Sequence, residues 1–146
     1  MKTIYTCVFL LSAVALNAQT PQSMTYQAVV RNALNALVQQ GNVGVRISIL
    51  QGTASGSVVY QESHLTATNI NGLLTLEIGM GSPVVGSFAA INWENGPYFI
   101  QSEIDTTGGS NYSITSTSQL LAVPYALHAK TSSDAARIKT LLYTGF

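Results

Sequence analysis

The chain has 146 residues and a formal net charge of zero, and only 8% of its residues are charged. Charged residues make up about a quarter of an average soluble protein, so Ser, Thr, Asn, Gln and Gly carry most of the polarity here. Because there is no basic patch and no basic amphipathic helix, the composition excludes nucleic-acid binding by counterion release and attachment to a membrane surface.

The N-terminal residues have the pattern of a secretory signal peptide. Lys2 supplies the positive charge, and a mostly apolar run covers residues 4–16. This run is too short to cross a bilayer, for which about 20 residues are needed. We expect residues 1–18 to be the signal peptide, cleaved after Ala18, and the mature chain to be secreted or held at the cell surface without a membrane span. Cys7 is the only cysteine, so the mature chain has neither a disulfide nor a thiolate site.

After the signal peptide, side chains alternate between apolar and polar with period two, which is the pattern of β-strands. The clearest case is residues 43–50, in which every second residue is Val or Ile. Asn71-Gly72 predicts a hairpin that joins the strands on either side of it. Residues 84–93 are less regular, and we expect them to cross from one sheet to the other. The predicted strands span residues 24–30, 36–39, 43–50, 58–66, 73–78, 98–104 and 112–121.

These strands predict an all-β fold, because no long helical pattern interrupts them. Seven strands at about ten-residue spacing are typical of a seven-stranded antiparallel β-sandwich, either immunoglobulin-like or transthyretin-like. We place this module at residues 19–130. Residues 131–146 form a short C-terminal tail, and the helical signal covers residues 126–142. The expected core consists of Val43, Val45, Ile47, Ile49, Leu74, Leu76, Ile78 and Ile100.

Five motifs follow one another in the sequence: YQAVVR at residues 26–31, VGVRISI at 43–49, NGL at 71–73, GPYFI at 96–100 and LLAVPYA at 120–126. Together they resemble the N-terminal β-sandwich module of secreted Bacteroidetes proteins. That module follows the signal peptide and precedes tail-fibre-like or other C-terminal domains. The resemblance covers about residues 20–131 and implies a structural or surface-display role with no catalytic residues.

The chain departs from that family in two places. The turn at residues 32–36 lacks the Asp and Gly that the family has there, so we expect a less well-formed hairpin. The resemblance also implies a downstream domain, which is absent. Residues 131–146 are therefore expected to be a truncated or altered tail.

Several acidic residues could carry chemistry. Glu62 and His64 are two residues apart on a predicted strand and share a face, so they could form a general-base pair or half of a metal site. Further ligands are missing, so we expect a solvated sheet face and no metal. Glu77, Glu103 and Asp105 could pair for glycoside hydrolysis or bind calcium. We expect them instead to be exposed strand positions that discourage edge pairing.

The aromatic residues suggest a different kind of site. Trp93 and Tyr98 could form a platform on which a sugar ring stacks, although Trp93 could instead plug one end of the sandwich. Thr106, in the sequence Asp105-Thr106-Thr107, matches a short O-glycosylation pattern of Bacteroidetes. No Gly-x-Ser-x-Gly elbow and no phosphate-binding Gly-rich loop occur in the sequence.

The sequence therefore predicts a secreted, non-catalytic structural or adhesive module that serves as a spacer or display domain. It needs no cofactor, and its expected partners are other surface proteins or glycans. The alternative is a carbohydrate-binding module that uses Trp93 and Tyr98. A third hypothesis is a hydrolase that gathers Glu62, Glu77 and Glu103 in one pocket.

Overall fold

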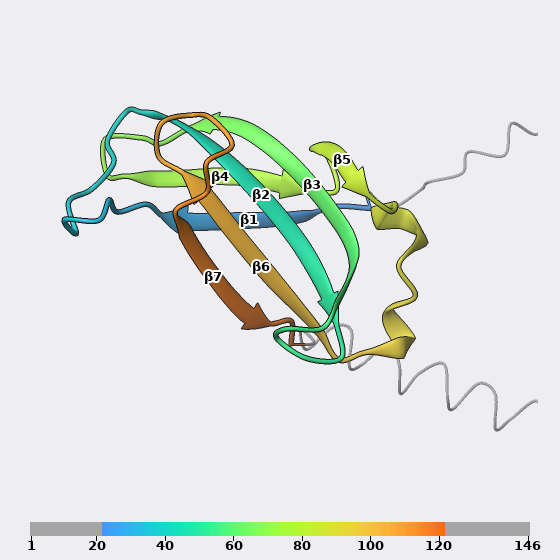
Figure 1. Cartoon of the computed structure of the whole chain (residues 1–146). Helices are drawn as coiled ribbons and strands as arrows, with labels where there is room; N and C mark the ends of the chain where they lie inside the picture. Colours follow the sequence, from blue (N-terminus) through green and yellow to red (C-terminus); the bar gives the residue numbers. More distant parts are fainter. Residues whose placement is uncertain (1–21, 122–146) are drawn as a thin grey trace, which may run out of the picture.

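A computed structural model describes residues 22–121, which form two antiparallel sheets packed face to face (Figure 1). The smaller sheet has the order β1-β4, and the larger one has the order β5-β3-β2-β6-β7. The predicted all-β, seven-stranded antiparallel sandwich is confirmed. The predicted signal peptide, the predicted tail at 131–146 and the helical signal at 126–142 lie outside the described residues. The elements are β1 (Met24–Val29), β2 (Asn42–Gln51), β3 (Ser57–Ala67), β4 (Leu73–Ile78), β5 (Ser82–Val85), the 3-10 helices η1 (Phe88–Ala90) and η2 (Trp93–Asn95), β6 (Tyr98–Asp105) and β7 (Ile114–Gln119).

The core lies between the two sheets. Every second residue of β2 points inward, and Val43, Val45, Ile47 and Ile49 have no exposed area. Burying a side chain of this size stabilises the fold by about 1.5–3 kcal/mol. The smaller sheet contributes the inner face of β4, whose apolar side chains pack in the same core as those of β2. All eight predicted core residues are buried: Val43, Val45, Ile47, Ile49, Leu74, Leu76, Ile78 and Ile100.

The predicted number of strands is correct, but one predicted strand is absent and one strand was not predicted. Residues 36–39 form no strand, because the chain makes only a single bridge between Arg31 and Leu37 before it turns toward β2. Asn35 takes a positive φ of 61° at this turn, a conformation that Asn adopts more readily than most residues. Conversely, residues 82–85, for which no strand is predicted, form the edge strand β5.

The predicted hairpin at Asn71-Gly72 is wrong, although the turn itself is present. Gly72 has a φ of 69° and donates its N–H to the carbonyl of Asn69 at 3.0 Å. Beyond the turn the strands separate, since β3 pairs with β2 and β5 whereas β4 pairs with β1. The turn is therefore a crossover between the two sheets.

The prediction that residues 84–93 cross between sheets is also wrong. β5 and β6 belong to the same five-stranded sheet, and the two 3-10 helices lead from its edge back to its interior (Figure 1). The crossing occurs one step earlier, between β4 and β5. This crossover consists of Gly79, Met80 and Gly81, and two of its N–H groups are hydrogen-bonded to a buried side chain of β3.

Candidate functional site

A buried carboxylate binds the crossover between β4 and β5. Glu62 lies on the inner face of β3 and has no exposed area. Its Oε1 accepts the N–H of Gly79 at 2.9 Å, and its Oε2 accepts the N–H of Gly81 at 2.7 Å and the hydroxyl of Tyr60 at 2.8 Å. One side chain of the larger sheet therefore fixes the chain where it arrives from the smaller sheet.

His64 completes this cluster on the next inward position of β3. Its Nε2 lies 2.9 Å from Glu62 Oε1, and this pair is a close contact that does not meet the geometry of a hydrogen bond. The expectation that Glu62 and His64 share a face is confirmed, and the expectation that the face is solvated is wrong. The face turns inward because Glu62 is opposite Ile47 in the register of β2 and β3.

The surroundings of Glu62 favour its charged form. Burial alone would raise the pKa of this carboxyl, but the contact with His64 and the donors of Gly79, Tyr60 and Gly81 outweigh burial, so the pKa is lowered. Burial, together with the adjacent carboxylate, raises the pKa of the Tyr60 hydroxyl. A general base requires a free lone pair and access to substrate. Both oxygens of Glu62 instead accept hydrogen bonds from its own chain, and the side chain has no exposed area.

Asp105, at the end of β6, is a second buried carboxylate that binds a connecting loop, as Glu62 does. We call each of these two carboxylates with its donors a latch. The Oδ1 of Asp105 accepts the N–H of Thr107 at 2.9 Å and the hydroxyl of Thr107 at 2.7 Å, and its Oδ2 accepts the N–H of Asn111 at 2.8 Å. The hydroxyl and N–H of Thr107, followed by the N–H of Asn111, hold the pKa of Asp105 below its usual value. Only 4% of Asp105 is exposed, so its expected place as an exposed strand residue is wrong. The N–H groups of Thr107 and Asn111 in the turn after β6 need a hydrogen-bond acceptor, and the Asp105 carboxylate provides it.

The loop that Asp105 holds covers one end of β2. A Cβ atom added to Gly44 would overlap the carbonyl oxygen of Gly109 in this loop. Glycine is therefore required at residue 44 by the close approach of the backbone rather than by its own φ angle. Thr106, the predicted O-glycosylation site, lies in the same loop and is half-buried. Its modification stays a prediction.

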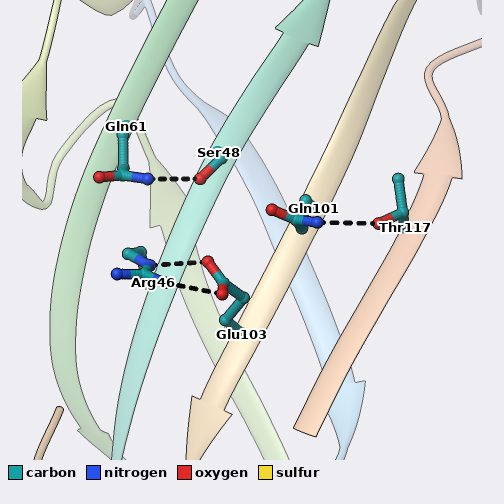
Figure 2. A network of polar contacts seen from close by, with 6 residues as sticks. All are labelled: Arg46, Ser48, Gln61, Gln101, Glu103 and Thr117. Carbon is teal, nitrogen blue, oxygen red and sulfur yellow. Dashed lines mark hydrogen bonds and ion pairs between the residues drawn. The ribbon is translucent and has the colours of Figure 1, made fainter. Parts of the chain in front are cut away.

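The remaining acids lie on the outer faces of the two sheets. Glu77 is exposed on the smaller sheet and accepts a hydrogen bond from Thr25 at 2.9 Å. Glu103 lies on the larger sheet and binds Arg46 through two hydrogen bonds of 2.6 and 2.7 Å, as Figure 2 shows. Glu62, Glu77 and Glu103 are thus on different faces, so the pocket of the hydrolase hypothesis is not formed. Within residues 22–121, no three His, Cys, Asp or Glu side chains are grouped as metal ligands.

The predicted aromatic residues come together at the end of the sandwich. Tyr60, Phe88, Trp93 and Tyr98 form a chain of edge-to-face contacts with ring centroids 5.4, 5.6 and 5.2 Å apart. Tyr98 is buried and donates its hydroxyl to the carbonyl of Asn92 at 2.6 Å. Trp93 is 44% exposed. Of the two predicted ligand-binding residues, Trp93 therefore presents its ring to solvent, whereas Tyr98 is buried and contacts the Trp93 ring edge to face.

A shallow hollow of about 350 Å³ lies beside Trp93. Phe88, Ile91 and Met24 supply apolar lining, and Gln22 and Ser23 supply polar groups at its rim. One exposed indole next to amide and hydroxyl groups is a composition that also occurs where sugars bind. The role of Trp93 and Tyr98 in ligand binding stays a prediction.

Sequence reasoning missed Tyr60 and Tyr26 as polar members of the interior. Tyr60 precedes Glu62 by two residues, and period-two alternation places both on one face; this spacing is the signal that could have found it. Tyr26 reaches across the core from β1 and donates its hydroxyl to Ser102 Oγ at 3.0 Å. No local signal indicates that contact, because the two residues meet only when the sheets pack.

Comparison with known proteins identifies a family. Residues 25–119 match the sequence profile of a family described as Domain of unknown function (DUF8740), and the chain therefore belongs to this family. No curated protein and no solved structure matches the chain. In the part of the chain that the structure describes, no helix has the length and apolar character needed to cross a membrane.

Proposed function

We propose that this member of the DUF8740 family is an exported, non-catalytic structural or adhesive module that serves as a spacer or display domain. The observation that carries the proposal is the state of the interior acids. Glu62 and Asp105 are both buried, and donors from adjoining loops of the same chain occupy both carboxylates. Catalytic carboxylates instead need access to a substrate.

The polar contacts outside these two latches also favour a structural role. Gly41 and Thr68 tie two crossovers together, because Gly41 donates its N–H to Thr68 Oγ1 at 3.1 Å and Thr68 donates its own N–H to the carbonyl of Gly41 at 3.0 Å. Each connection between the sheets is thus held by polar groups in addition to the core. Such reinforcement suits a domain without disulfides that must stay folded outside the cell.

Surface labelling of intact cells tests the proposal of export and display. An epitope inserted between Ala54 and Ser55, in the exposed loop between β2 and β3, leaves both sheets intact. We expect an antibody that cannot enter cells to bind this epitope on intact cells, with a cytoplasmic protein as the control for lysis. Detection only after the cells are permeabilised would contradict a display role.

A second candidate function is carbohydrate binding at the hollow beside Trp93. The specific observation in its favour is that Trp93 is half-exposed at the rim of a hollow, while its ring is held in place by Phe88 and Tyr98. Aromatic faces stack on the C–H groups of sugar rings and orient them without using charge. The low charge of the chain is compatible with a neutral ligand of this kind.

A glycan array distinguishes the two functions. If the chain is a structural or adhesive module with no sugar site at the hollow, Trp93→Ala is expected to leave any glycan binding unchanged. A carbohydrate-binding module would bind a defined set, and Trp93→Ala would abolish that binding. Tyr112→Ala serves as the matched control, since Tyr112 is a partly exposed aromatic residue that packs on Arg46 far from the hollow. Binding that Trp93→Ala removes and Tyr112→Ala preserves would replace the structural proposal with the second one.

A further inference from the structure

The two outer strands of the larger sheet differ in how they are protected. β5 has four residues, contains Pro83, and shifts its register against β3 between Gln61 and Glu62. Short length, proline and irregular register are ordinary means of keeping a sheet edge from pairing with other chains. β7 has none of them: its six residues are uncharged, contain no proline and pair with β6 in one unbroken register.

The backbone of β7 offers free hydrogen-bonding groups on its open side. Leu120, directly after β7, donates its N–H to the carbonyl of Tyr98 at 2.9 Å. Antiparallel strands alternate between hydrogen-bonded and non-hydrogen-bonded pairs, so the even-numbered residues of β7 bond to β6. Thr115, Thr117 and Gln119 therefore point their N–H and C=O groups away from β6. Within residues 22–121, no strand lies on that side.

A row of polar side chains leads across the outer face of the larger sheet to this edge. Gln61, Ser48, Gln101 and Thr117 lie directly opposite one another on four neighbouring strands. Gln61 donates to Ser48 Oγ at 2.9 Å, and Gln101 donates to Thr117 Oγ1 at 3.3 Å (Figure 2). The hydroxyl of Thr117 thus accepts from its own sheet and keeps its hydrogen for a donor contact beyond the edge.

We propose that the β7 edge pairs antiparallel with the same edge of a second copy of this chain. A two-fold axis at Thr117 pairs this residue with its copy, and it pairs Thr115 with Gln119 of the second copy. The groups that point outward then meet in hydrogen-bonded pairs, and the polar row continues from one sheet into the other. The five strands of each copy become one continuous sheet.

The composition of β7 favours its own copy as the partner. Two-fold pairing places Thr117 opposite its own copy, so a charge at this residue would face a like charge. β7 has no charge, and its Thr and Ser side chains form favourable cross-strand pairs with one another. On the adjoining outer face, the charges of Arg46 and Glu103 neutralise each other.

The contact is small, and this determines the expected affinity. One pair of short strands buries less than the roughly 1,200–2,000 Å² of a standard stable interface. We therefore expect a reversible dimer with a dissociation constant between about 10 µM and about 1 mM. Such an association becomes important where many copies are displayed together. It goes beyond the proposed function and does not depend on it, because an edge pairs in the same way wherever the chain resides.

Sedimentation velocity of the mature chain, from about 10 µM to about 1 mM, tests the proposal. Thr117→Lys places two ammonium groups opposite each other at the axis, and we expect it to weaken the dimer roughly fivefold or more. Thr75→Lys is the matched control. Thr75 is also a strand threonine whose Oγ1 accepts from a glutamine, Gln27, at 3.3 Å, but it is exposed and lies on the smaller sheet, whereas Thr117 is half-buried. We expect Thr75→Lys to dimerise like the wild type.

Hydrogen exchange of the wild type provides a second measurement that needs no variant. The amides of Thr115, Thr117 and Gln119 should become protected as the concentration rises, while the dimer appears. A wild type that stays monomeric at about 1 mM overturns the proposal. Edge amides that are protected in the monomer overturn it as well, because another segment of the chain would then already cover the edge. Equal loss of dimer in Thr117→Lys and Thr75→Lys also overturns it, because added charge alone would then explain the effect.

Discussion

Replacing Glu62 with alanine is expected to lower the free energy of unfolding by about 3–5 kcal/mol, because the change removes one partner from a buried charged network. The N–H groups of Gly79 and Gly81 and the hydroxyl of Tyr60 would lose their acceptor in the interior. An unsatisfied buried donor costs about 1–3 kcal/mol. Urea denaturation followed by circular dichroism measures the change.

Two further variants make this prediction specific. Glu77→Ala removes a carboxylate that is exposed and accepts from side-chain hydroxyl groups, so we expect a loss below about 1 kcal/mol. Glu62→Gln keeps the shape of the side chain but offers one acceptor oxygen in place of two, and it should fall between the other two variants. A loss in Glu62→Ala no greater than that in Glu77→Ala would contradict a latch at the crossover.

The lowered pKa of Glu62 also predicts how stability depends on pH. Its pKa is lower in the folded chain than in the unfolded one, where Glu titrates at about 4.3, so the carboxylate stabilises the fold above that pH. This contribution should be lost as the pH falls through the folded pKa. Asp105 has a lowered pKa and acts in the same direction. Glu62→Gln should therefore lose less stability than the wild type between pH 5 and pH 3, as measured by urea midpoints.

Gly44→Ala is expected to destabilise the fold by about 2–4 kcal/mol, although it adds only a methyl group. The new Cβ would occupy the space of the carbonyl oxygen of Gly109. The loop after β6 cannot move away freely, because Asp105 holds it through Thr107 and Asn111. Either the loop is displaced from its latch or β2 shifts within the sheet. Thermal unfolding measures the loss of stability.

Gly96→Ala is the matched control for this substitution. Its added Cβ would lie 3.5 Å from the nearest atom, Tyr98 Cδ2, which is an ordinary van der Waals contact. We expect a change below about 1 kcal/mol in this variant. If Gly44→Ala were as stable as Gly96→Ala, the loop would not be held against β2 as the structure describes.

The sequence predicted the parts of the fold that depend on local alternation. β2 shows why: Val43, Val45, Ile47 and Ile49 are apolar at every second residue, so its inner face can be recognised without knowing its neighbours. The same reasoning predicted β4 and the burial of Ile100. Which strands pair could not be obtained in this way, because pairing depends on contacts between residues far apart in the chain. The Asn71-Gly72 turn was recognised for its φ preference, but that preference does not determine which sheet the next strand joins.

The sequence of β3 explains why Glu62 was predicted to lie on the solvated face of the sheet. Its alternation is ambiguous, because apolar residues occur at both parities. Leu65 faces outward and is 73% exposed, whereas Glu62 faces inward and has no exposed area. A carboxylate is rarely buried without partners, so the pattern alone favoured a solvated Glu62. Its partners, Gly79 and Gly81, become available only because the chain crosses between sheets at that point.

The candidate site was also predicted only in part from the sequence. Trp93 was recognised as an aromatic residue beside a turn, and its position at the end of the sandwich follows from that turn. Tyr98 was expected to present its ring to a ligand, yet it is the first residue of β6 and turns into the core, where its hydroxyl binds the carbonyl of Asn92. This orientation depends on which face of β6 turns toward the core, and the pairing of β6 with β2 determines that face.

Hydrogen exchange of the Gly79 and Gly81 amides tests the central claim most directly, namely that the buried acid holds the fold rather than performing chemistry. Both amides lie in a short crossover loop, where exchange would be fast without an acceptor. We predict that in the wild type at neutral pH they exchange as slowly as the amide of Ile47 in the core, through global unfolding. Exchange as fast as that of Thr53, in an exposed loop, would contradict the claim, because Glu62 would then not hold the crossover.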